Sequence, residues 1–252
     1  VLRSGLAGIG QYVIGEQAVG LMAAFVPKWM YEGDAVMMET ALSSSGRGRS
    51  ASFSMPLRAI LEDSTLHYSY DKLTLGSVRD FVPDHYVYGY HFMSYMRKEY
   101  GPDFWDKVMH YISWRPFLVQ PKSFAIRKYS GHWQSYVHRE AMNEWKKIWE
   151  EGTDSGFRSA PAPLHEIQHF EEHNFVSVQQ AFPFPDGGAV FLQTDRRRLS
   201  KWMSRTAEGK ESLLCRPGVI MGKAIFSYPY LAWTEYDVHP RYEMAAYSVI
   251  RC

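Results

Sequence analysis

Apolar positions in the first 151 residues recur at the three- and four-residue steps of an α-helix. The clearest such segment is 132–151, in which one face carries Trp133, Tyr136, Val137, Ala141, Trp145 and Ile148. Further helices, the first of them a helix or helix-loop, are predicted over residues 5–25, 28–42, 84–100 and 103–113. Pro27 is typical of a helix start, and Ser43–Gly46 and Gly101-Pro102 are typical of helix ends.

From about residue 171 the pattern changes to the short, alternating runs of β-strands. Strands are predicted over residues 175–181, 189–194, 199–205, 211–216, 230–236 and 242–250. Turn sequences separate them, including Asp186-Gly187-Gly188 and Glu208-Gly209-Lys210. Such spacing is typical of a sandwich, barrel or propeller, and about 80 residues suffice for one four-stranded propeller blade and part of another.

Residues 152–163 consist largely of Gly, Ser, Pro and Ala, which is typical of a domain linker. The sequence therefore predicts a multidomain α + β chain. Its parts are a helical region at 1–151, a linker at 152–170 and antiparallel strands at 171–252.

Charge and composition exclude some classes of function. The 28 Lys and Arg residues nearly balance the 27 Asp and Glu residues, so we expect no nucleic-acid partner. No apolar run reaches the roughly 18 to 20 uncharged residues of a membrane-spanning helix. Cys215 and Cys252 define neither a disulfide framework nor a metal site, which leaves the redox compartment undetermined.

The two ends of the sequence suggest a piece of a longer protein. Residue 1 is Val, and no signal peptide follows it. The strand predicted at 242–250 runs almost to the last residue without a polar tail.

On the helix predicted at 28–42, Glu32, Val36 and Glu39 share one face. Carboxylates beside Met and Trp side chains are costly to bury unless they bind a metal or accept hydrogen bonds. Alternatively, Glu32 is an exposed residue of the first turn, where the helix dipole favours negative charge.

The segment Trp29-Met30-Tyr31-Glu32-Gly33-Asp34-Ala35 resembles the gluzincin metallopeptidases, the thermolysin and aminopeptidase N group. In that group the Glu of Trp-x-Asn-Glu-Gly-x-Ala is the third zinc ligand, after two His of an upstream His-Glu-x-x-His helix. The resemblance implies that Glu32 is a zinc ligand, with Glu39 and Asp34 as its outer partners. Tyr31 stands where the family has Asn.

A second segment, 84–105, resembles the family helix whose Tyr-x-Lys-Gly motif carries a tyrosine that stabilises the tetrahedral intermediate. Tyr86 matches that tyrosine, 54 positions after Glu32, and Tyr88 replaces the Lys. In such a site zinc activates a water molecule, and a phenol that donates to the oxyanion contributes about 3 kcal/mol. Taken alone, without Glu32, Tyr86 is better explained as an ordinary tyrosine at the edge of a core.

No His-Glu-x-x-His precedes Glu32. The resemblance thus implies a zinc peptidase acting on a peptide or protein, with zinc held by the complete protein and this chain inactive alone. A non-catalytic relative, acting as a binding or scaffold module at the cell envelope, is the alternative that Tyr31 and Tyr88 favour.

A literal match to the zinc motif lies elsewhere, at His165-Glu166-Ile167-Gln168-His169. Prolines 161 and 163 crowd its start, and charged residues follow it. His165 and His169 are therefore either an alternative metal site or part of a solvated linker helix.

The β part resembles the opening of a TolB-like β-propeller, in which an Asp-Gly turn, a Gly-Lys-Glu turn and a Trp-x-Glu strand recur blade by blade. The matching residues are Asp186-Gly187, Gly209-Lys210-Glu211 and Trp233-Thr234-Glu235. Residues 32–49 resemble a stretch found in large bacterial surface or periplasmic proteins, which implies a periplasmic or surface location. Residues 43–49 could also form an anion-binding nest, but they lack the Gly-Lys-Ser/Thr of a phosphate loop, and a helix C-cap with a connecting loop explains them better.

Overall fold

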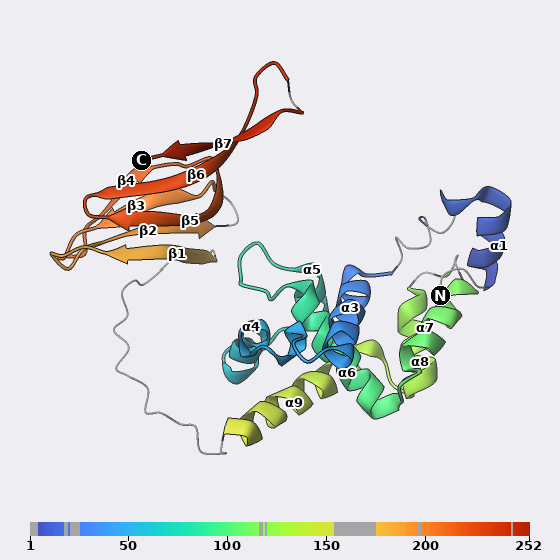
Figure 1. Cartoon of the computed structure of the whole chain (residues 1–252). Helices are drawn as coiled ribbons and strands as arrows, with labels where there is room; N and C mark the ends of the chain where they lie inside the picture. The colour runs from blue at the N-terminus through green and yellow to red at the C-terminus, as the bar shows by residue number, and fades with distance from the viewer. Residues whose placement is uncertain are drawn as a thin grey trace. The chain divides into compact units, whose positions relative to one another are not determined.

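The computed structural model describes residues 5–17, 20, 26–115, 118, 120–153, 175–195, 198–242 and 244–252. The chain divides into two compact units, 1–77 with 82–164, and 78–81 with 165–252. Helices make up the first unit and antiparallel strands the second, as Figure 1 shows. The prediction of a mixed α + β chain is confirmed at this level.

The helices of the first unit follow the sequence signals closely where those signals are strong. Their bounds are α1 Gly5–Ile14, α3 Lys28–Leu42, η1 Arg47–Arg49, α4 Ala51–Glu62, α5 Tyr70–Leu75, α6 His85–Tyr100, α7 Phe104–Ser113, α8 Pro121–Ser130 and α9 Gln134–Thr153. Helix α6 begins one residue later than predicted because Asp84 is its N-cap, and the Asp84 carboxylate accepts a hydrogen bond from the Tyr86 backbone N–H.

Three helices, α4, α5 and α8, were not predicted. Helix α4 contains Pro56, which normally ends a helix, and α5 has only six residues, too few to show a helical period. The prediction of a helix or helix-loop over residues 5–25 agrees with the structure where it is described, since α1 ends at Ile14, Gly15 follows with φ +96°, and Glu16, Gln17 and Gly20 are helical again. Residues 21–25 lie outside the described residues.

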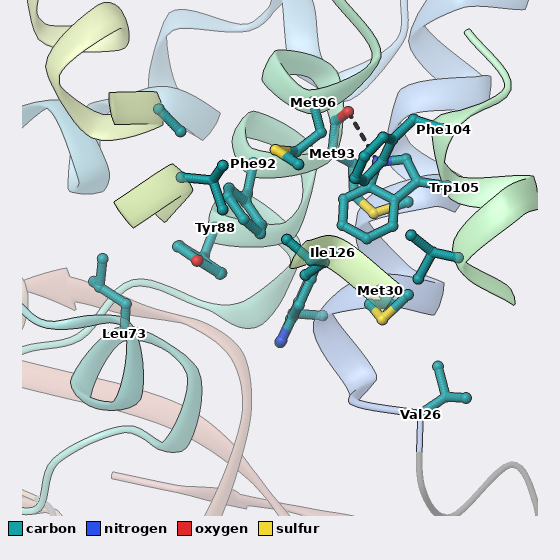
Figure 2. Close-up of a cluster of buried hydrophobic side chains, with 14 of the residues drawn as sticks. Val26, Met30, Leu73, Tyr88, Phe92, Met93, Met96, Phe104, Trp105 and Ile126 are labelled. Atoms are coloured by element: carbon teal, nitrogen blue, oxygen red, sulfur yellow. Dashed lines mark hydrogen bonds between the residues drawn. The ribbon is translucent and has the colours of Figure 1, made fainter. Parts of the chain in front are cut away.

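The core of the helical unit gathers around α6. Figure 2 shows side chains of α3, α5, α7 and α8 packed with Tyr88, Phe92, Met93 and Met96 of that helix. Trp29 of α3 lies edge-on to Tyr88 and Phe92, at ring-centre distances of 5.7 and 5.4 Å. These edge-to-face contacts account for the high aromatic content of the helical unit.

Helices α3 and α6 touch through two glycines. A Cβ on Gly33 would lie 2.3 Å from the carbonyl carbon of Gly89, and a Cβ on Gly89 would lie 2.1 Å from the Trp29 oxygen. The two backbones are therefore in direct contact. This crossing places the helical turn of α3 that contains Glu32 against the helical turn of α6 that contains Tyr86.

The second unit contains two antiparallel meanders within its described residues. The first sheet is ordered β1-β2-β3-β4 and the second β5-β6-β7. Their bounds are β1 Val176–Pro183, β2 Ala189–Asp195, β3 Lys201–Arg205, β4 Glu211–Cys215, β5 Val219–Ser227, β6 Tyr230–Val238 and β7 Ala246–Arg251. Strand β5 was not predicted, and the predicted start of the last strand at 242 was wrong. Backbone hydrogen bonds link His239 to Tyr242 and to Ala245 before β7 begins.

Two side chains tie this unit together. Gln180 lies in a bulge of β1 with φ +49°, and its Oε1 accepts a hydrogen bond from the Ala224 N–H of β5, 2.5 Å away. Glu235 of the Trp-x-Glu strand accepts hydrogen bonds from Trp233 Nε1 at 2.8 Å and from the Gly218 N–H at 3.0 Å. Glu235 thus secures the turn before β5, which is a structural role.

Candidate functional site

The structure brings Glu32 and Tyr86 together. The Glu32 carboxylate accepts a hydrogen bond from the Tyr86 phenol, and this bond is the main reason that the pKa of Tyr86 is raised. Both side chains are half-buried. The contact follows from the glycine crossing of α3 and α6, so two residues singled out by separate motifs meet because of how their helices pack.

Arg47 completes this cluster from the loop after α3. Its guanidinium carbon lies 5.2 Å from the centre of the Tyr86 ring. Its Nε donates to Glu39 Oε2 over 2.8 Å, and its backbone N–H donates to Glu39 Oε1 over 3.2 Å. These hydrogen bonds lower the pKa of Glu39. Residues 43–49 are therefore a loop and short 3-10 helix held to α3 by Glu39.

Asp34 pairs with a different arginine. Its Oδ1 accepts a hydrogen bond from Arg97 Nη1 of α6 over 2.7 Å. The two carboxylates expected to be outer partners of a metal ligand are thus each engaged by an arginine.

The described residues do not by themselves fit a zinc ion. A catalytic zinc requires three protein ligands, and no group of three or more His, Cys, Asp or Glu side chains in this part of the chain could hold a metal. Glu32 offers one carboxylate. The alternative ligands His165 and His169 lie outside the described residues.

A pocket of about 590 Å³ opens beside this cluster. Lys28 and His85 belong to its lining, and they connect it to the cluster: Lys28 stands one helical turn before Glu32, and His85 directly precedes Tyr86. The rest of the wall comes from several elements and includes Trp29, Tyr70, Lys122 and Gln134.

Lys122 is the most unusual group in the pocket. Its Nζ donates a hydrogen bond to the Tyr70 hydroxyl, which also accepts one from Trp29 Nε1 over 3.2 Å. The same Nζ lies 4.8 Å from the centre of the Tyr70 ring and 5.3 Å from that of Trp29. Burial lowers the pKa of Lys122 to about 8 and raises that of Tyr70 to about 12.

Behind this pocket, Tyr88 and His138 form a buried polar pair. Tyr88 Oη lies 3.1 Å from His138 Nδ1, and His138 Nε2 lies 3.3 Å from the Tyr68 carbonyl oxygen. Because a carbonyl only accepts, Nε2 carries the proton, and Nδ1 accepts from the Tyr88 hydroxyl. Burial lowers the pKa of His138. Tyr88, which stands in place of the family's Lys, is therefore a fully buried core residue.

The sequence predictions missed Lys122, Tyr70 and His138. One signal was available for the lysine: Lys28 and Lys122 both lie in the first turn of a helix, where the helix dipole disfavours a cation.

Comparisons of the chain with models of protein families, with curated proteins and with solved structures gave no match. The gluzincin and TolB-like resemblances therefore stay predictions drawn from short motifs. Among the described residues, no helix is both long enough and apolar enough to cross a membrane.

Proposed function

We propose that this chain is the helical part of a gluzincin-type zinc peptidase, followed by the first strands of a TolB-like β-propeller. The observation that carries this proposal is the contact between Glu32 and Tyr86. In the family these positions supply a zinc ligand and a hydroxyl donor to the same reacting carbonyl, so they must lie side by side. The four-stranded meander β1–β4 has the strand number of one propeller blade.

The proposal requires two further ligands from a His-Glu-x-x-His helix, which this sequence lacks ahead of Glu32. In the complete protein the substrate would be a peptide or protein, and the location would be periplasmic or at the cell surface. In this chain Glu32 orients the Tyr86 hydroxyl, and the Arg47–Glu39 pair holds the loop that covers the Tyr86 ring.

The test uses the full-length protein, purified without chelators, with zinc measured by elemental analysis and hydrolysis measured on a peptide library. We expect about one zinc per chain. Glu32→Gln should lower both zinc content and hydrolysis, because an amide is a poorer zinc ligand than a carboxylate. Glu62→Gln, at an exposed carboxylate on α4 paired with Arg58, is the matched control and should change neither. Full zinc content and activity in Glu32→Gln would refute the proposal.

A non-catalytic binding or scaffold module is the second candidate. The direct hydrogen bond from Tyr86 to Glu32 favours it, because a carboxylate satisfied within the chain has less need of a metal. A full-length protein that contains no zinc and cleaves no peptide, yet binds peptides, would support this candidate over the first.

A further inference from the structure

The ammonium of Lys122 lies in an environment that is costly for a charge. It sits between aromatic rings, and no carboxylate in the described part of the chain forms an ion pair with it. Its one direct side-chain partner among those residues is the neutral Tyr70 hydroxyl. The nearest opposite charge that acts on it is the Asp71 carboxylate of α5, which attracts the ammonium without a contact ion pair, so Lys122 keeps capacity to bind an anion.

The other charged groups around the pocket add to this preference. Lys28 of α3 lines the cavity together with Lys122 of α8, and Asp71 of α5 is the acidic group in the lining. His85 of α6 also lines it, with its Nδ1 3.0 Å from Asp84 Oδ1. Trp29 and Tyr70 supply flat apolar walls, and Gln134 supplies an amide. The pocket therefore favours a small anionic group attached to an organic chain over a free inorganic ion.

The position of the pocket relates it to the Glu32–Tyr86 cluster. Lys28 and Glu32 are one turn apart on α3, which is about 6 Å along the helix axis. An extended peptide advances about 3.3 Å per residue. A peptide bond placed at Glu32 and Tyr86 would therefore put a group about two residues away at the pocket.

We propose that this pocket, in which Lys122 supplies the ammonium, binds a carboxylate of a peptide whose reacting bond lies at Glu32 and Tyr86. The carboxylate is either an acidic side chain or the C-terminus of the peptide. The choice of a peptide as the ligand rests on the proposed function. The pocket and its positive charge do not depend on whether the protein hydrolyses peptides.

The experiment measures binding and cleavage separately on the full-length protein. Two pairs of peptides distinguish the source of the carboxylate: acetyl-Ala-Ala-Glu-Ala-amide against its Gln counterpart, and acetyl-Ala-Ala-Ala-Ala as free acid against its amide. Kd is measured by calorimetry and cleavage by chromatography. We expect one acidic peptide to bind about ten- to hundred-fold more tightly than its neutral counterpart.

Three variants test the role of the lysine. Lys122→Met should remove the preference for the acidic peptide, whereas Lys122→Arg should keep part of it. Lys107→Met, at an exposed lysine of α7 outside the pocket lining, should behave as the unmodified protein. We expect Lys122→Met to fold, since it replaces a buried charge with an apolar chain of similar length.

The outcomes separate this inference from the proposed function. A Lys122-dependent preference without any cleavage would support the pocket and contradict the peptidase. Cleavage or binding with no preference for a carboxylate, or a preference unchanged in Lys122→Met, would overturn the pocket assignment.

Discussion

At the scale of single residues, the hydrogen bond between Tyr86 and Glu32 places a phenol proton where a proposed reaction would use it. The phenol is protonated at neutral pH even at the ordinary tyrosine pKa of 10.0, and the hydrogen bond to the Glu32 carboxylate raises the pKa of Tyr86 further. A protonated phenol can donate to a developing oxyanion, whereas a phenolate cannot.

In the full-length protein, Tyr86→Phe should therefore leave zinc content unchanged and lower kcat about 10²- to 10³-fold, with KM nearly constant. Elemental analysis and steady-state kinetics check this. Tyr95→Phe, at a half-buried tyrosine further along α6, is the control and should retain activity. An unchanged kcat in Tyr86→Phe would remove the hydroxyl from the proposed reaction.

At the scale of elements, the crossing of α3 and α6 positions Glu32 next to Tyr86. Gly33 lies inside a helix, where glycine is unfavourable, and its absence of a side chain allows the two backbones to touch. Any side chain there must push the helices apart. Such a shift would also separate Glu32 from Tyr86 and disturb the packing of Trp29.

Gly33→Ala should lower the free energy of unfolding by about 3 kcal/mol or more, because its Cβ would lie 2.3 Å from the Gly89 backbone. Gly152→Ala in α9 is a matched control, since nothing lies within 4 Å of the added methyl. That control should be neutral or stabilising by up to about 1 kcal/mol. Urea denaturation measures both, and equal effects of the two substitutions would contradict the helix contact.

At the scale of the whole molecule, the helical unit buries neutral histidines and so should be sensitive to acid. His91 is 1% exposed, and its Nδ1–H donates to the Val87 carbonyl oxygen over 2.7 Å. Burial lowers the pKa of His91 from 6.5 to about 4. Between these two values the unfolded chain binds a proton that the folded chain excludes, so stability falls as the pH falls.

We expect the free energy of unfolding to fall by about 3 kcal/mol from this group between pH 6.5 and pH 4, with no further loss from it below pH 4. Denaturation curves at pH 7, 6 and 5 measure the slope. His91→Gln should lose stability at pH 7 through poorer packing against Trp145, yet show a shallower slope. An equal slope in both proteins would assign the acid sensitivity to other groups, such as His138.

The sequence alone determined the features that depend on neighbouring residues. Helical periodicity, the helix end at Gly101 and the turn at Asp186-Gly187 are local, so they predicted the helical and β parts of the chain and several elements, such as α3, α6 and β2, to within one or two residues. Glu32 and Tyr86, by contrast, were singled out by the resemblance of two short segments to family motifs.

Only the tertiary structure decided what those residues contact and which further groups join them. The pocket draws Lys28, Tyr70, Lys122 and Gln134 from four separate helices, and no local pattern links them. The ion-pair partners of Asp34 and Glu39 could not be predicted from the sequence either, because Arg97 and Arg47 come close to them only through packing. Burial and the resulting pKa shifts depend on how helices distant in sequence pack, and that information is not present in any single segment.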